Sequence, residues 1–439
     1  MPLLPVLPEH LGASIDAVSW VGTISLVSGA MVTAMIGRLG ERFGMRRALL
    51  TCVIAGLAGS LLGALSRSLL HLLVARALQG GAVGATSLTL GILRGAFPGD
   101  RARNAMTVLS VGTVMISIGT VPLVTAVLLD VSVWQAAFWA GVVTSVASGA
   151  LVIRCVDADV PTRAGSFDLV GASGICVVLT VVLLPVSRGT TWGWASPTTI
   201  ALFAASAPLA AAWWSWERRH PSPVIDPEVF RHRPVALIHA ASFVIGFAVW
   251  AQLLLTYAIV QLPASTGHGL GRSFLVAALV QAPGIAALAV GAPVATHAMA
   301  RYRPRPVLAG GCIVVCAGFV FTTVFHATAV EIGVGSAIVL CGLGVGYGTV
   351  PALLGEHHPA HETARSNALT AISRVVGSAV AGAVAGTVLA TFTTTADGRE
   401  YPSDTAFRSL YGLCALVAAI GVVAAIAVGA GRRPVFQNA

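Results

Sequence analysis

The sequence places one arginine inside a long apolar stretch, with a glutamine and two glycines one turn further along. The string is LVARALQGG, and its functional candidates are Arg76, Gln79 and Gly80. An arginine at the centre of a membrane helix costs about 3 kcal/mol on insertion scales, so it needs a polar cavity or a polar partner. A purely structural arginine that donates to helix carbonyls is the alternative interpretation.

A short charged segment, GRLGERFGMRR at residues 37–47, joins the first two apolar runs. Its glycines permit close helix approach and a tight turn. Glu41 can pair with nearby guanidinium groups, and such pairs can break and re-form between two conformations. We therefore predict an electrostatic latch made of Gly37, Gly40, Glu41, Arg42, Gly44, Arg46 and Arg47.

A second set of candidates consists of polar or amphipathic side chains within later apolar runs. Polar groups inside a membrane usually face the interior of a helix bundle, where they can line a substrate cavity. Hydrogen bonds between packed helices are the alternative. The cavity candidates are Trp250, Gln252, Tyr257, Gln281 and Arg374.

Apolar helices must position these side chains, because 56% of the residues are hydrophobic and only 10% are charged. A soluble domain carries about 25% charged residues. Each membrane crossing needs roughly 20 mostly uncharged residues, and the sequence predicts an all-α polytopic membrane protein with thirteen crossings. They lie at 18–36, 48–65, 69–93, 106–129, 133–153, 169–186, 198–216, 235–262, 274–299, 307–325, 332–354, 368–392 and 407–430.

The basic residues indicate the orientation of the chain. With residues 37–47 in the cytoplasm, nineteen of the 26 basic residues fall in cytoplasmic segments, which agrees with the positive-inside rule. The net charge of +9 is then explained by topology and anionic lipid, and nucleic-acid binding is not indicated. The seven cysteines lie mostly in apolar runs and predict neither a disulfide framework nor a metal site.

Long charged segments divide the chain into three predicted parts: residues 1–156, 157–234 and 235–439. They hold five, two and six spans, a pattern that lacks one helix of a six-plus-two-plus-six arrangement. Residues 1–12 are apolar but too short to cross a membrane. We therefore expect an N-terminal bundle that lacks most of its first helix, a two-helix insertion and a complete C-terminal bundle.

The segment at 37–47 resembles the signature loop after the second helix of major facilitator superfamily transporters, with Glu41 where that family usually has Asp. The string around Arg76 resembles the fourth-helix motif of the family, in which the arginine is associated with proton transfer. The resemblance covers essentially the whole chain. It implies two six-helix bundles that alternate access to a central substrate site.

Further strings resemble one branch of that family, the fourteen-helix drug:proton antiporters. The fifth-helix motif that marks antiporters is instead degraded to GTVPLVTAVL, which counts against antiport. Pro122 keeps the kink, but Val121 replaces the first glycine and Thr125 and Ala126 replace a pair of glycines. The extra hairpin opens with FDLVGASG at Phe167 and turns at RGTTWGW from Arg188. Both strings are similar to those of actinobacterial members of the branch.

The expected function is proton-driven efflux of small amphipathic drugs or metabolites by a multi-pass, monomeric protein of the cell membrane. Its partners would be a small-molecule substrate, protons and membrane lipid, with no cofactor and no enzymatic reaction. All seventeen acids lie in loops or at span ends, so no carboxylate is an obvious proton carrier. Uptake or uncoupled export of one metabolite, and a truncated membrane protein without transport, stay open as alternatives.

Overall fold

The computed structural model describes residues 15–131, 134–157, 168–221, 223–225, 233–357 and 363–427. Within these ranges, eleven helices are long and apolar enough to cross a membrane. Contacts divide the chain into two compact units, and each unit is built from separate stretches of sequence. The first comprises Met1–Phe97, Val127–Arg231 and His358–Ile372, and the second Pro98–Ala126, His232–His357 and Ser373–Ala439. The three-part division at residues 156 and 234 stays a prediction.

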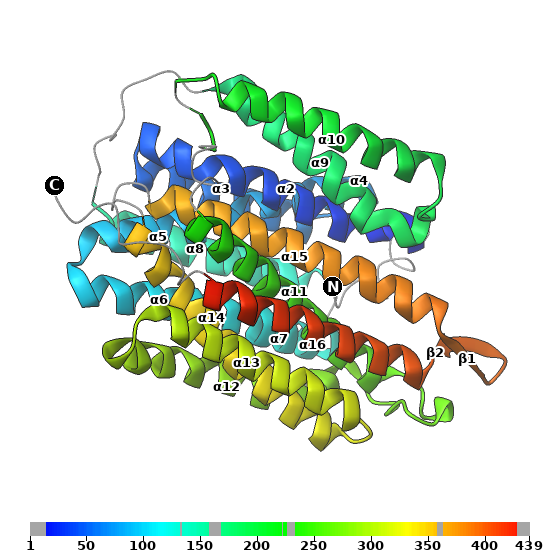
Figure 1. Cartoon of the computed structure of the whole chain (residues 1–439). Coiled ribbons are helices and arrows are strands. Elements are labelled where there is room, and N and C mark those ends of the chain that lie inside the picture. The colour runs from blue at the N-terminus through cyan, green and yellow to red at the C-terminus, as the bar shows by residue number, and fades with distance from the viewer. Residues whose placement is uncertain are drawn as a thin grey trace. The chain divides into compact units, whose positions relative to one another are not determined.

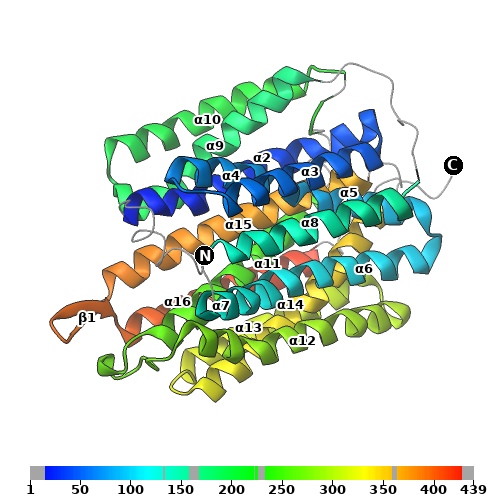
Figure 2. The same ribbon diagram turned by 180° about the vertical axis from the view of Figure 1, so that it is seen from behind.

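The helices of the first unit follow the predicted apolar runs. In this unit α2 packs against α4 and α9, α3 packs against α4 and α8, and α9 pairs with α10. Figure 1 shows α9 and α10 side by side as a hairpin, and Figure 2 shows α3 beside α8. The bounds are α2 (Ile15–Phe43), α3 (Met45–Ala64), α4 (Leu69–Gly81), η1 (Ala82–Gly84), α5 (Ala85–Ala96), α8 (Ala136–Cys155), α9 (Leu169–Trp192) and α10 (Pro197–Glu217).

Two of the thirteen predicted crossings are not among the eleven candidate spans. The run at 69–93 is divided by the 3-10 turn η1 into α4 and α5, neither of which is long enough alone. Glycines weaken a helix by roughly 0.5–1 kcal/mol each relative to alanine, and Gly84 allows the chain to approach the Ile36 side chain closely. The predicted run at 198–216 is helical as α10.

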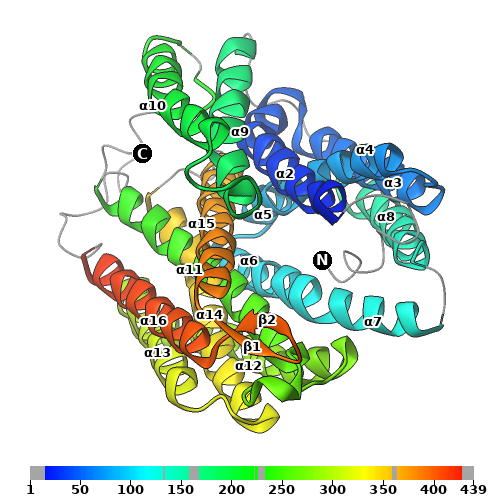
Figure 3. The ribbon, with the colours of Figure 1, turned by 90° about the vertical axis from the view of Figure 1, so that its right-hand side faces the viewer.

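The second unit is organised around α14, which packs against α12, α13, α11 and α6. Its core includes Phe319, Phe407 and Tyr411, and Figure 3 shows α13 beside α16. The bounds are α6 (Gly99–Met115), η2 (Ile116–Thr120), α7 (Val121–Val131), α11 (Arg233–Gln261), η4 (Ala264–Thr266), α12 (Phe274–Arg301), α13 (Pro304–Val324), α14 (Ala329–His357), α15 (Thr363–Thr391), β1 (Thr393–Ala396), β2 (Arg399–Pro402) and α16 (Asp404–Ala427).

A small β-hairpin, which the apolar pattern did not predict, joins α15 to α16 (Figure 3). β1 and β2 are antiparallel, with Thr393 opposite Pro402 and Ala396 opposite Arg399. Asp397 and Gly398 form the two-residue turn with φ angles of 51° and 71°. Such left-handed conformations at both positions are why Asp-Gly is a favoured hairpin turn.

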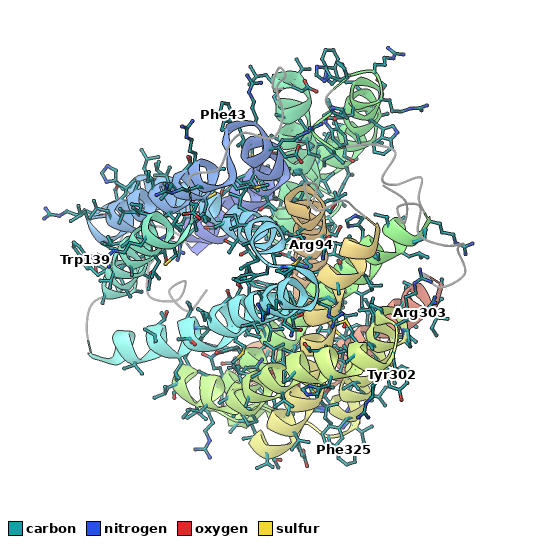
Figure 4. All side chains as sticks on the ribbon, turned by 90° about the vertical axis from the view of Figure 1, so that its left-hand side faces the viewer. Phe43, Arg94, Trp139, Tyr302, Arg303 and Phe325 are labelled. Carbon is teal, nitrogen blue, oxygen red and sulfur yellow. The ribbon has the colours of Figure 1, made fainter. Side chains whose placement is uncertain are left out.

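Large apolar side chains remain exposed on the outer helices. Phe43, Trp139 and Phe325 stand on the outside of the ribbon in Figure 4, and each has 47% of its surface exposed. On a water-soluble protein such a distribution would be costly, whereas lipid is the natural solvent for it. The chain is a multi-pass membrane protein.

Candidate functional site

Arg76 on α4 lies at the centre of a small polar cluster inside the first unit. Its Nη1 donates to Gln79 Oε1 at 3.2 Å, and Gln79 Nε2 donates to Ser60 Oγ at 3.1 Å. The guanidinium carbon lies 5.0 Å from the centre of the Phe138 ring, in cation–π contact. Arg76 Nε has no hydrogen-bond acceptor among the described residues. The arginine is thus only partly satisfied by its surroundings.

Glycines allow α2, α3 and α4 to hold this cluster. A Cβ on Gly80 would overlap Ser28 Oγ and lie 2.9 Å from the backbone of α2. A Cβ on Gly59 of α3 would lie 2.6 Å from the Ala75 carbonyl oxygen. Small residues therefore bring three backbones close together around Arg76, as at many membrane helix interfaces. The structure brings Arg76 and Gln79 into contact and places Gly80 at a packing contact.

No carboxylate in the described ranges forms an ion pair with Arg76. The apolar and aromatic wall of Phe138, which is 3% exposed, covers one face of the guanidinium. A buried guanidinium with one open nitrogen can hold an anionic or neutral hydrogen-bond acceptor, because it always carries its charge and its donors.

The predicted loop at 37–47 is almost entirely helical. α2 continues to Phe43 and α3 begins at Met45, so Gly44 alone connects them. Its φ of 95° is a conformation that favours glycine. The tight turn is present, and it consists of one residue.

The acid of this segment pairs with an arginine that the sequence reasoning missed. Arg38 Nη1 lies 3.1 Å from Glu41 Oε2, one turn apart on α2, and the side chains are 10% and 4% exposed. Arg38 Nε also donates to the Pro223 carbonyl oxygen at 2.8 Å. The i, i+3 spacing of Arg38 and Glu41 was the available signal.

The remaining arginines of the segment serve different contacts. Arg46 Nη2 donates to the Ile153 carbonyl oxygen of α8 at 2.9 Å, which ties α3 to α8. The guanidinium of Arg42 lies 5.3 Å from the Phe43 ring centre. Arg47 is exposed. The switching role of the whole segment stays a prediction.

Pro122 follows a π-helical turn, η2, which connects α6 to α7. The Val121 amide donates to the Ile116 carbonyl five residues back. Proline cannot make the next amide bond of an α-helix, and its ring clashes with the carbonyl four residues earlier, so a wider turn relieves that clash. Nearby, a Cβ on Gly119 would lie 2.7 Å from Ile285 of α12. Gly119 therefore makes a close glycine contact six residues before Thr125, the first position of the lost glycine pair.

The two glutamines among the cavity candidates are buried, and each makes a hydrogen bond to a hydroxyl group. Gln252 is 1% exposed and donates through Nε2 to Thr256 Oγ1 at 3.0 Å on the same helix. Gln281, also 1% exposed, accepts from Ser336 Oγ at 3.0 Å and joins α12 to α14. The Gln281 contact matches the alternative of a hydrogen bond between packed helices. The Gln252 bond lies within α11, and Gln252 Oε1 has no partner among the described residues.

The other three candidates are only partly buried. Trp250 and Tyr257 are seven residues apart on α11, so they share one helix face. Tyr257 stacks on Phe274 with ring centres 4.8 Å apart. Arg374 of α15 lies over the Tyr347 ring of α14, 5.2 Å from its centre. Tyr257 and Arg374 therefore take part in two separate aromatic contacts.

A third intramembrane arginine also escaped the sequence reasoning. Arg188 was expected at the turn of the hairpin, but α9 continues to Trp192 and the turn begins at Gly193. Arg188 is 1% exposed and lies 4.6 Å from the centre of the Trp20 ring on α2. The indole faces of Trp20 and Trp192 compensate for the burial of its charge. The opening of the hairpin at Phe167, and residues 1–12, lie outside the described residues.

The sequence and structure were compared with known proteins. The family model described as Major Facilitator Superfamily matches residues 1–382. A multidrug resistance protein, Stp, of Mycobacterium tuberculosis is 28% identical over 85% of this chain and 69% of its own length. A tetracenomycin C resistance and export protein of Streptomyces glaucescens is 27% identical over 85% of this chain and 67% of its own length.

One solved structure, the human organic anion transporter MFSD10 (TETRAN), matches 96% of this chain and 88% of its own with a TM-score of 0.63. The identity is 12%, so this likeness concerns the fold alone. The chain spans 44% of the length of other curated relatives to which it is 30% identical.

Proposed function

The chain belongs to the Major Facilitator Superfamily, and from this premise we propose that it exports small amphipathic compounds in exchange for protons. The observation that carries the proposal is Arg76, a partly satisfied charge buried between three helices of the first unit. Maintaining such a charge in a membrane helix is costly unless the charge is used.

Proton coupling through Arg76 does not require the arginine itself to titrate. Arginine stays protonated in proteins, so it would act by attracting an acceptor to its open Nε in one conformation and releasing it in another. Transport in one direction requires that the affinity of Arg76 for this acceptor differ between the two conformations. The alternating states of the proposed exporter would differ in what Arg76 contacts.

The proposed substrate class rests on the names of the relatives and on the second unit. The relatives include proteins named for multidrug resistance and for tetracenomycin C export. The half-buried aromatic side chains of Trp250 and Tyr257 offer stacking and apolar contact to a flat, amphipathic molecule. The α9–α10 hairpin supports membership of the fourteen-helix branch, in which the hairpin is an insertion between two bundles.

Accumulation of a panel of fluorescent amphipathic compounds in cells that lack their own exporters tests the proposal. Cells with the protein should retain less compound, and a protonophore should abolish the difference. A difference that survives the protonophore would indicate uncoupled transport, and no difference for any compound would contradict export.

Substrate contact is tested within the same assay by a matched pair on α11. Trp250→Ala should change which compounds are exported, since the half-buried indole is removed. Gln252→Leu should leave the substrate range unchanged, because that side chain is buried against its own helix. Equal effects of the two substitutions would exclude a specific role for Trp250.

A further inference from the structure

The α9–α10 hairpin ends in two buried carboxylates that face each other. Asp168 caps the N-terminus of α9, and its Oδ1 accepts from the Gly171 amide at 2.8 Å. Glu217 is the last residue of α10. The two residues are 5% and 1% exposed. A Cβ on Gly171 would overlap both Asp168 Oδ2 and Glu217 Oε1, so the two carboxylates converge on one small space.

The two acids have unequal surroundings. Trp216 Nε1 donates to both oxygens of Asp168, at 3.2 and 3.1 Å, and His220 Nδ1 lies 3.5 Å from Asp168 Oδ2. Glu217 accepts at Oε2 from the Ile225 amide at 3.3 Å, while its Oε1 has no hydrogen-bond partner among the described residues. Asp168 therefore receives the larger set of donors, whereas one oxygen of Glu217 is buried without a partner among the described residues.

Other charged groups around the pair come from α10 and α2. Arg218 and Arg219 follow Glu217 in sequence. On α2, which packs against α9, Arg38 contacts the Pro223 carbonyl and is paired with Glu41 at 3.1 Å. No described cation forms an ion pair with Glu217.

Residues 223–225 connect this pair to α2. The Ile225 amide is bound by Glu217, and Val224 and Ile225 are 2% and 7% exposed. At the other end, the Pro223 carbonyl accepts from Nε and Nη2 of Arg38. The segment thus covers Glu217 and at the same time holds the arginine that pairs with Glu41.

We propose that Asp168 and Glu217 form a proton-binding site whose occupancy decides whether residues 223–225 stay closed over Glu217 and against Arg38. When the pair holds one proton it carries a single negative charge, which lies beside the Trp216 indole N–H and the His220 ring. Without the proton, two like charges face each other away from water, and the charged Glu217 is relieved when the covering segment lifts and admits water. Proton binding at the hairpin would in this way be coupled to the Arg38–Glu41 ion pair of α2.

The direction of this effect follows from the burial of Glu217, which lies beyond the apolar span of α10. Burial, with a further contribution from the charge of Asp168, raises the pKa of Glu217 to about 7, and the Ile225 amide opposes the shift. A state in which Glu217 is solvated has a lower pKa, so rising pH favours that state. The open fraction of the segment should therefore increase as the pH rises through about 7.

Thiol labelling at the covering segment tests the site without any transport assay. Val224→Cys is introduced in a Cys155→Ser background, because Cys155 is the exposed cysteine among the described residues. The maleimide labelling rate of the introduced cysteine is measured at each pH and divided by the labelling rate of Cys155 in the protein without substitutions. Cys155 is the reference thiol, so the ratio cancels the intrinsic pH dependence of the labelling reaction. This ratio should rise with a midpoint near pH 7.

Two substitutions separate the proton site from a general loosening of the structure. Glu217→Gln is permanently neutral and should abolish the pH dependence of the labelling ratio. Asp168→Asn removes the neighbouring charge and should move the midpoint to lower pH. The control substitution Glu400→Gln, at an exposed position in the second unit, should change neither the pH dependence of the labelling ratio nor its midpoint. A ratio that does not depend on pH, or one with the same midpoint in Glu217→Gln, would overturn the proposal.

Infrared titration of the protein without introduced cysteines gives an independent reading should Val224→Cys fail to fold. A carboxylic-acid band that disappears near pH 7, and is absent in Glu217→Gln, is expected. If no such band titrates in this range, the site is not a proton site. Either result stands whether or not the protein exports drugs, since only the physiological use of the site rests on the proposed function.

Discussion

Replacing Arg76 with alanine should abolish transport while leaving the fold intact. Three contributions decide the stability change. Burying an arginine at the centre of a membrane helix costs about 3 kcal/mol on insertion scales. The hydrogen bond from the charged guanidinium to Gln79 Oε1 stabilises the fold by about 1.5–3 kcal/mol. The cation–π contact with the Phe138 ring stabilises it by about 0.5–2 kcal/mol. These terms nearly cancel, so the net change should stay within about 2 kcal/mol.

The assay measures three quantities on the same preparations. They are the amount of protein in the membrane, the melting temperature in detergent, and the rate of compound efflux driven by a proton gradient. For Arg76→Ala we expect a normal amount, a melting temperature shifted by only a few degrees, and efflux reduced at least about tenfold, which corresponds to 1.4 kcal/mol in the barrier. Arg399→Ala, at an exposed hairpin position, is the matched control.

Two outcomes would refute the reasoning. Efflux at the original rate in Arg76→Ala would make the arginine a structural residue. Loss of the protein from the membrane would show that its contacts with Gln79 and Phe138 outweigh the cost of its burial.

Three further changes have defined outcomes. Glu41→Gln should leave Arg38 without its charged partner and slow efflux, while cysteine accessibility shows altered populations of the two transport states. Gly80→Ala should lower stability by about 1–3 kcal/mol in thermal unfolding, because the added Cβ meets the backbone of α2. The control Gly310→Ala, whose added Cβ meets nothing within 4 Å, should leave the stability unchanged. The stability contributed by protonated Glu217 should be present below its ordinary pKa and lost as the pH rises through about 7. Glu217→Gln should remove this pH dependence of thermal unfolding.

The membrane helices could be predicted from sequence because each corresponds to one long, continuous run of apolar residues. A run of roughly 20 apolar residues has few structural options in lipid. The interruption at Ala82–Gly84 was missed for the same reason, since a 3-10 turn leaves the apolar count unchanged. The short hairpin after α15 was missed because its strands, TTTA and REYP, are short and carry no apolar alternation.

The contacts of the candidate site were harder to predict than its residues. The sequence identified Arg76 and Gln79, but the choice of Phe138 as the aromatic partner depends on how α8 packs against α3. It identified Glu41 but assigned it no definite partner among the arginines. Asp168 and Glu217 are 49 residues apart, and only the pairing of α9 with α10 brings them together. Long-range pairing of this kind leaves no periodic signal in a single sequence.

The π turn at Ile116–Thr120 has a consequence for the evolution of this helix. It accommodates one residue more than a regular helix would, and one residue corresponds to about 100° of rotation about the axis. Deleting one codon within the turn would return the helix to regular winding and keep the flanking halves aligned with their neighbours. Deleting one codon from α6 would instead rotate one flank relative to the other. Alignments with relatives that lack the turn should therefore carry a one-residue gap at this place.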